Sequence, residues 1–126
     1  MADLIDRAAI LSRRILAIDD EEANVLLLAS LLEREGYSDV HGLTDPGRAM
    51  ETFLDLDPDL VLLDLMMPGV DGFQLLEAFA RHGRADQFRP ILVLTADTTL
   101  QARRRALSLG AKDFVVKPFQ PSRVLE

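Results

Sequence analysis

Short apolar runs that suit buried strands alternate along this sequence with stretches that carry helix signals, and this alternation restricts the fold more than any other feature. The runs lie at 15–19 (ILAID), 60–63 (LVLL), 90–95 (PILVLT) and 112–117 (KDFVVK), with a weaker one at 37–43 (YSDVHGL). The run at 60–63 is apolar throughout, which is typical of a strand covered on both faces. Because parallel neighbours need helical crossovers, the sequence predicts an α/β fold with a doubly wound, five-stranded parallel sheet.

Capping signals indicate where the intervening helices begin and end. The expected capping residues are Thr44 or Asp45 for the second helix, with Pro46 in its first position, Asp71 for the third and Thr98 for the fourth. Asp71 with Gln74, and Thr98 with Gln101, have the spacing of a capping box. The glycines expected to close helices are Gly36, Gly83 and Gly110.

Composition narrows the class of protein. The 126 residues suffice for one domain, and 48% hydrophobic with 28% charged residues is typical of a globular protein. A net charge of −7 argues against direct nucleic-acid binding by this domain, and the lack of cysteine excludes disulfides and thiolate metal sites. No apolar run has the length of a membrane span or the form of a signal peptide. We therefore expect a cytoplasmic protein without a membrane partner.

Polar side chains follow the predicted strands at their carboxyl ends, where doubly wound sheets bind ligands. These residues are Asp19 and Asp20, Asp64, Thr95 and Lys117. Three neighbouring carboxylates repel one another unless a cation neutralises them, and oxygen ligands without His or Cys favour Mg²⁺. A carboxylate can also attack phosphorus while a metal and a lysine stabilise the charge. The set therefore predicts metal-assisted phosphoryl transfer to an aspartate.

Four motifs in fixed order resemble the receiver domain of bacterial two-component response regulators, of the chemotaxis-regulator type. They are DD at 19–20, DLMMPGVDG at 64–72, LTA at 94–96 and KPF at 117–119. The separations are 45 residues from Asp19 to Asp64, then 31 to Thr95 and 22 to Lys117. The resemblance implies a flavodoxin-like fold with strand order 2-1-3-4-5. It implies a receiver domain at 14–126, preceded by an N-terminal extension at 1–13.

The resemblance also implies roles for the acidic and basic residues. Asp64 would accept a phosphoryl group from a sensor histidine kinase or a phosphotransfer protein. Asp20 and Asp64, with the backbone carbonyl of Met66, would ligate Mg²⁺, and Asp19 would hold a metal-bound water. Lys117 would pair with the phosphoryl oxygens.

The same resemblance implies a switch rather than an enzyme that acts on a foreign substrate. Thr95 would hydrogen-bond the new phosphoryl group, and Phe114 would turn inward into the vacated space. The surface around the fourth helix and fifth strand, which includes the exposed run 103–105, would then change. Residues two beyond the acceptor influence water access in this family, so the apolar Met66 is expected to slow dephosphorylation.

Both ends of the chain carry further expectations. The last helix barely begins at 121–126, so we expect a truncated helix and a longer regulator with an effector domain beyond residue 126, or a separate downstream effector protein. The apolar Val124 and Leu125 would favour a homodimer. At the other end, Leu4 and Leu11 share one side of a short helix that would make an accessory contact or remain disordered.

Other interpretations of the same residues stay open. Asp20 can cap the first helix instead of binding metal. A flavin-binding module shares the architecture, although the acidic segment 19–22 would repel a phosphate. A metal-dependent phosphatase typically needs a second acid two residues after its nucleophile, where this chain has Met66. A degenerate receiver would bind partners without phosphoryl transfer, and the intact motif residues argue against it.

Overall fold

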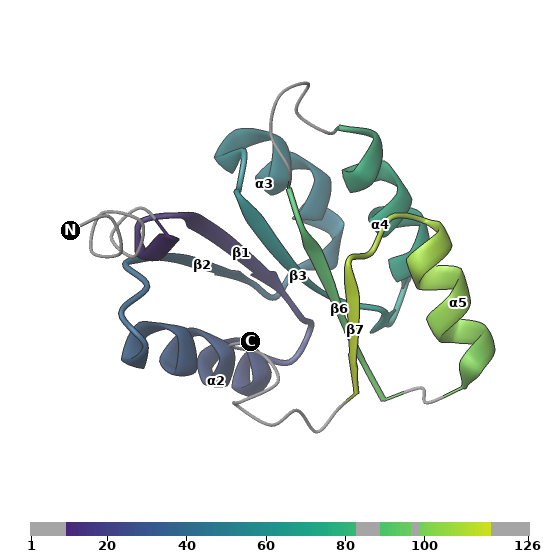
Figure 1. Ribbon diagram of the computed structural model, residues 1–126, viewed down its shortest axis with the longest axis horizontal. Coiled ribbons are helices and arrows are strands. Elements are labelled where there is room, and N and C mark those ends of the chain that lie inside the picture. Colours follow the sequence, from purple (N-terminus) through teal and green to yellow (C-terminus); the bar gives the residue numbers. More distant parts are fainter. Residues whose placement is uncertain (1–9, 83–88, 97–98, 117–126) are drawn as a thin grey trace.

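The computed structural model describes residues 10–82, 89–96 and 99–116, which form a sheet with helices on both faces (Figure 1). The strands are β1 (Arg14–Ile18), β2 (Asp39–Leu43), β3 (Leu60–Asp64), β6 (Ile91–Thr95) and β7 (Asp113–Val116). All pair in parallel, in the order β2-β1-β3-β6-β7. Numbered among themselves, these strands have the order 2-1-3-4-5, so the predicted doubly wound sheet is confirmed. The predicted truncated helix at 121–126 lies outside the described residues.

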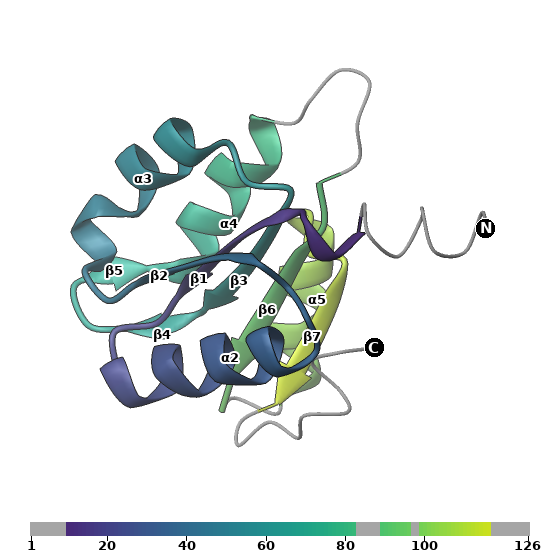
Figure 2. The same ribbon diagram turned by 90° about the vertical axis from the view of Figure 1, so that its left-hand side faces the viewer.

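The helices divide between the two faces of the sheet (Figures 1 and 2). They are α2 (Glu22–Arg34), α3 (Ala49–Leu56), α4 (Gly72–Arg81) and α5 (Leu100–Ser108), with a 3-10 turn, η1 (Pro46–Arg48), before α3. Alternate strand residues point to opposite faces. Leu16 and Ile18 therefore join the cluster beneath α3, α4 and α5, whereas Ile15 and Ala17 pack with Leu28 of α2. No helix in the described part of the chain has both the length and the apolar character needed to cross a bilayer.

Most of the predicted helix caps are present. Asp45 accepts the Gly47 N–H at 3.0 Å, and Asp71 accepts the Phe73 N–H at 2.9 Å. Gly36 and Gly110 follow α2 and α5 with φ of +102° and +120°, which glycine adopts without steric cost. Thr98 was wrong as the cap of α5, because Thr99 directly precedes the helix and its hydroxyl accepts the Ala102 N–H at 3.2 Å. Thr98 itself and Gly83 lie outside the described residues.

A small hairpin follows β3, where the sequence predicted only a turn. Its strands are β4 (Met66–Met67) and β5 (Val70–Asp71), which pair antiparallel across Pro68 and Gly69. Gly69 has φ of +76°, as the third residue of a type II turn requires, and proline suits the position before it. The hairpin gives the segment between Asp64 and α4 a fixed backbone.

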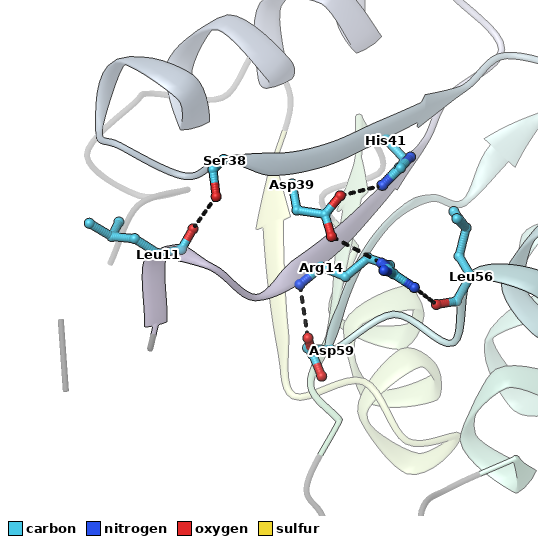
Figure 3. Close-up of polar contacts among 7 residues, drawn as sticks. All are labelled: Leu11, Arg14, Ser38, Asp39, His41, Leu56 and Asp59. Carbon is cyan, nitrogen blue, oxygen red and sulfur yellow. Dashed lines mark hydrogen bonds and ion pairs between the residues drawn. The ribbon is translucent and has the colours of Figure 1, made fainter. Parts of the chain in front are cut away.

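Arg14 makes several hydrogen bonds at the end of the sheet where the strands begin (Figure 3). Its Nε lies 3.0 Å from Asp39 Oδ2, and its Nη1 donates to the Leu56 carbonyl at 2.8 Å. The Arg14 N–H donates to Asp59 Oδ2 at 2.8 Å, and the Asp59 N–H donates to the Arg14 carbonyl at 2.8 Å. Arg14 first, and His41 at 2.6 Å second, hold the pKa of Asp39 below its usual 3.8. Arg14 thus connects β1 with β2 and with the loop before β3.

Arg89 makes a second, more buried connection at the same edge, with a side chain only 5% exposed. It pairs with Asp57 and donates to the carbonyls of Pro58 and His82, each at 2.7 Å. The guanidinium also lies 4.6 Å from the ring centre of Phe53. Arg89 therefore links β6 to the ends of α3 and α4.

The end of the N-terminal extension contacts the domain. Ile10 and Leu11 are helical, and the Leu11 carbonyl accepts the Ser38 N–H at 3.1 Å and the Ser38 hydroxyl at 3.3 Å (Figure 3). Of the two expectations for this segment, residues 10–13 match the accessory contact. Leu4 lies outside the described residues.

Candidate functional site

The sheet brings the three predicted carboxylates together. Asp19 and Asp20 follow β1, and Asp64 is the last residue of the adjacent β3, where Ile18 pairs with Leu63. Carboxylate oxygens of the three aspartates lie within 4.8 Å of one another. Asp19 is 1% exposed and Asp64 2% exposed, whereas Asp20 is half-buried and accessible. The convergence predicted from the sequence is therefore present in the fold.

Backbone groups fix the directions of the two buried carboxylates. Asp19 Oδ1 accepts the Glu21 N–H at 3.0 Å, and Asp64 Oδ1 accepts the Met66 N–H at 3.1 Å. The backbone is held as well, because the Asp19 N–H donates to the Leu43 carbonyl at 3.1 Å. These contacts with the backbone help to hold the two carboxylates in place.

The donor set fits a hard divalent cation. Burying carboxylates so close together is unfavourable unless a positive charge compensates them. All three offer oxygen, the ligand type that Mg²⁺ prefers, and the accessible Asp20 leaves an approach from solvent. The residues present can therefore hold Mg²⁺.

Thr95 lies on β6, the strand next to Asp64, and Phe114 lies on β7, one strand further from the acidic cluster. Thr95 is the last residue of β6, fully buried, one position after Leu94, which pairs with Asp64. Phe114 of β7 is 4% exposed and belongs to the core cluster on the side of α3, α4 and α5. Lys117, the predicted partner of the phosphoryl group, lies outside the described residues.

The hairpin presents its two methionines to opposite sides. Met66 is 60% exposed, whereas Met67 is 5% exposed and belongs to the core. Gly72 begins α4 so close to this segment that a Cβ there would lie 2.5 Å from the Leu65 carbonyl oxygen. The sequence motif contains Gly72, but its pattern alone does not reveal this close approach.

Arg105 connects α5 to the start of α4, a contact that the sequence did not predict. The run 103–105 is exposed, as expected for a solvated helix face. The guanidinium of Arg105 nevertheless lies 4.1 Å from the ring centre of Phe73, the residue after Gly72. An arginine at helical spacing could not indicate which aromatic ring it would meet.

Comparison with known families gives a direct match. The family model described as the response regulator receiver domain matches residues 15–126. This chain belongs to the response regulator receiver family. The match covers most of the receiver domain expected from the motifs, and it favours that interpretation over a flavin-binding module or a metal-dependent phosphatase.

Individual relatives of this receiver domain differ in length. The chemotaxis protein CheY of Thermotoga maritima is 34% identical over 116 residues, which cover 92% of this chain and 94% of that protein. The DNA-binding response regulator MtrA of Mycolicibacterium smegmatis is 38% identical over 113 residues, 90% of this chain but 47% of that protein. The receiver domain therefore spans nearly all of CheY and about half of MtrA.

Solved structures agree with the observed fold. The chemotaxis protein CheY4 of Vibrio cholerae superposes with a TM-score of 0.80 at 28% identity, covering 90% of this chain and 93% of that one. The receiver domain of a DNA-binding response regulator from Colwellia psychrerythraea gives a TM-score of 0.81 at 27% identity, covering 90% and 92%. This receiver domain thus has the chemotaxis-regulator fold.

Proposed function

We propose that this receiver domain accepts a phosphoryl group on Asp64 from the phosphohistidine of a sensor histidine kinase or a phosphotransfer protein. In this step the phosphorus–nitrogen bond of the donor breaks and a bond between phosphorus and a carboxylate oxygen of Asp64 forms. The convergence of three carboxylate oxygens within 4.8 Å, one of them from the buried Asp64, carries the proposal. The domain acts as a regulatory phosphoacceptor rather than as an enzyme with a substrate of its own.

The acidic residues form the proposed magnesium site. Asp20, Asp64 and the carbonyl of Met66 would ligate the ion, and Asp19 would hold a metal-bound water. The ion would supply positive charge that offsets the negative charge of the phosphoryl oxygens and the carboxylates. The hydrogen bond from the Met66 N–H to Asp64 Oδ1 orients the carboxylate. Lys117 pairs with the phosphoryl oxygens.

Thr95 and Phe114 form the proposed switch. Thr95 reaches the cluster from the next strand and hydrogen-bonds the phosphoryl group. Phe114 occupies the neighbouring strand β7, where Val93 is its partner in the sheet. A shift of these two residues changes the surface formed by α5 and β7, which a downstream effector domain or protein then recognises.

The test is phosphorylation with a small donor. The chain is incubated with acetyl phosphate and Mg²⁺, and its intact mass is measured. We expect one added phosphoryl group on the wild type and none on Asp64→Asn. Asp45→Asn is the matched control, because asparagine still accepts the Gly47 N–H and the residue caps η1. An unmodified wild type, or equal labelling of Asp64→Asn, would contradict the proposal.

A further inference from the structure

Met66 is the most exposed methionine in the described part of the chain. It is 60% exposed, against 5% for Met67, and Met50 is half-buried. Strand β4 explains the contrast, since successive side chains of a strand point to opposite sides. The chain has no cysteine, so thioethers are its only sulfur groups. An oxidant that reacts with sulfur will therefore meet Met66 before Met50 or Met67.

The backbone of Met66 has a fixed position beside Asp64. Its N–H donates to Asp64 Oδ1 at 3.1 Å, and its pairing with Asp71 holds it in the hairpin. Only Leu65, which is 4% exposed, separates the two residues in sequence. A chemical change of the Met66 side chain therefore takes place on a residue whose backbone is bonded to the Asp64 carboxylate.

We propose that Met66 is an oxidation site through which peroxides shorten the lifetime of the phosphoryl group on Asp64. This inference rests on the proposed function. The peroxide transfers one oxygen atom to the sulfur: a sulfur–oxygen bond forms and the oxygen–oxygen bond breaks. Sulfur loses two electrons, and the peroxide is reduced to water or an alcohol. The product, methionine sulfoxide, is polar, and methionine sulfoxide reductases reverse the change.

The direction of the effect follows from hydrogen bonding. A thioether is a weak acceptor, so the exposed Met66 side chain offers little hydrogen bonding to water near this segment. The sulfoxide oxygen is a strong acceptor and can hold such a water. One net hydrogen bond to the attacking water accelerates hydrolysis about fivefold, which corresponds to about 1 kcal/mol.

The first experiment tests the site without any phosphorylation. The chain is treated with limiting hydrogen peroxide and digested into peptides. Tandem mass spectrometry of these peptides gives the sulfoxide content at each methionine. We expect oxidation at Met66 well before Met50 and Met67, with the peptide of Met1 scored separately. Equal or faster oxidation of Met50 or Met67 overturns the assignment.

The second experiment tests the consequence. Treated and untreated chains are phosphorylated with acetyl phosphate and Mg²⁺, the donor is removed, and the loss of the phosphoryl group is followed by mass. We expect the wild type to lose the phosphoryl group about fivefold faster after treatment, and the reductase to reverse this effect. Met50→Leu should show the same difference between treated and untreated samples. Met66→Leu should show no effect of treatment. Each protein is compared with its own untreated sample.

The outcomes separate the two proposals. Equal lifetimes in the treated and untreated wild type, or an undiminished treatment effect in Met66→Leu, overturn the inference. An untreated wild type that takes up no phosphoryl group overturns the proposed function and the lifetime effect with it. The oxidation preference is still decided by the fragment masses in that case.

Discussion

The substitution Asp20→Asn tests whether the three carboxylates repel one another when no cation is bound. Asp20 is the accessible member of the cluster, and asparagine keeps its size while removing its charge. The structure therefore predicts that the variant is more stable than the wild type in a metal chelator and gains less stability from Mg²⁺.

The magnitude follows from the separation of the oxygens. The oxygens lie within 4.8 Å of one another, and two unit charges at this largest separation repel by about 0.9 kcal/mol in water and about 3.5 kcal/mol at an effective dielectric constant of about 20. Asp20 is half-buried, so its repulsion lies between these two values. Its charge also interacts favourably with the start of α2, which reduces the gain from removing it. We expect a net stabilisation of about 1–2 kcal/mol.

Urea unfolding in a chelator and in Mg²⁺ measures both effects. At a Mg²⁺ concentration about 100 times its dissociation constant, the free energy of unfolding of the wild type should rise by about 2.7 kcal/mol. The Asp20→Asn variant should lose most of this gain. Glu21→Gln is the matched control: it removes one charge beside the same helix, and its side chain makes no cap hydrogen bond. It should stay within about 0.5 kcal/mol of the wild type. If Asp20→Asn is no more stable than Glu21→Gln in chelator, the repulsion argument is refuted.

Three further substitutions give separate tests. Gly72→Ala should destabilise the chain by about 1–3 kcal/mol in urea unfolding. The new Cβ would lie 2.5 Å from the carbonyl oxygen of Leu65 and 2.6 Å from the Cα of Leu65. An unchanged urea midpoint would contradict this prediction. Asp39→Asn should be less stable than the wild type at neutral pH. Because Arg14 and His41 lower the pKa of Asp39 in the folded protein, this difference in stability should shrink as the pH falls below 3.8. A difference that does not change with pH would argue against the contact. Met66→Asn should lose the phosphoryl group about fivefold faster than the wild type at equal Mg²⁺, and a faster wild type would refute the shielding role of Met66.

The sequence was sufficient to predict the sheet and the acidic cluster. Each central strand is apolar on both faces, which predicts its burial in a parallel sheet, and the order of the strands came from the family resemblance. Asp19 and Asp64 come at the ends of adjacent strands, and parallel pairing brings such ends together. Neither prediction needs a knowledge of side-chain packing.

Features that depend on contacts distant in sequence were not predictable. Arg89 is almost buried because Asp57 and the ring of Phe53, more than 30 residues away, surround its guanidinium. The choice of Thr99 over Thr98 depends on where the first turn of α5 begins, and two adjacent threonines offer the same chemistry. Such details follow from tertiary packing.

Contacts at the amino-terminal ends of β1 and β3 help to place the carboxylates at their carboxyl ends. The reciprocal hydrogen bonds between Arg14 and Asp59 fix the register of β1 against β3, in which Ile15 pairs with Leu60 and Ile18 with Leu63. A slip of one residue would turn every side chain of β3 to the other face and carry Asp64 away from Asp19. The carboxylates of Asp19 and Asp64 therefore meet because the contact between Arg14 and Asp59, five residues before each of them, aligns the two backbones.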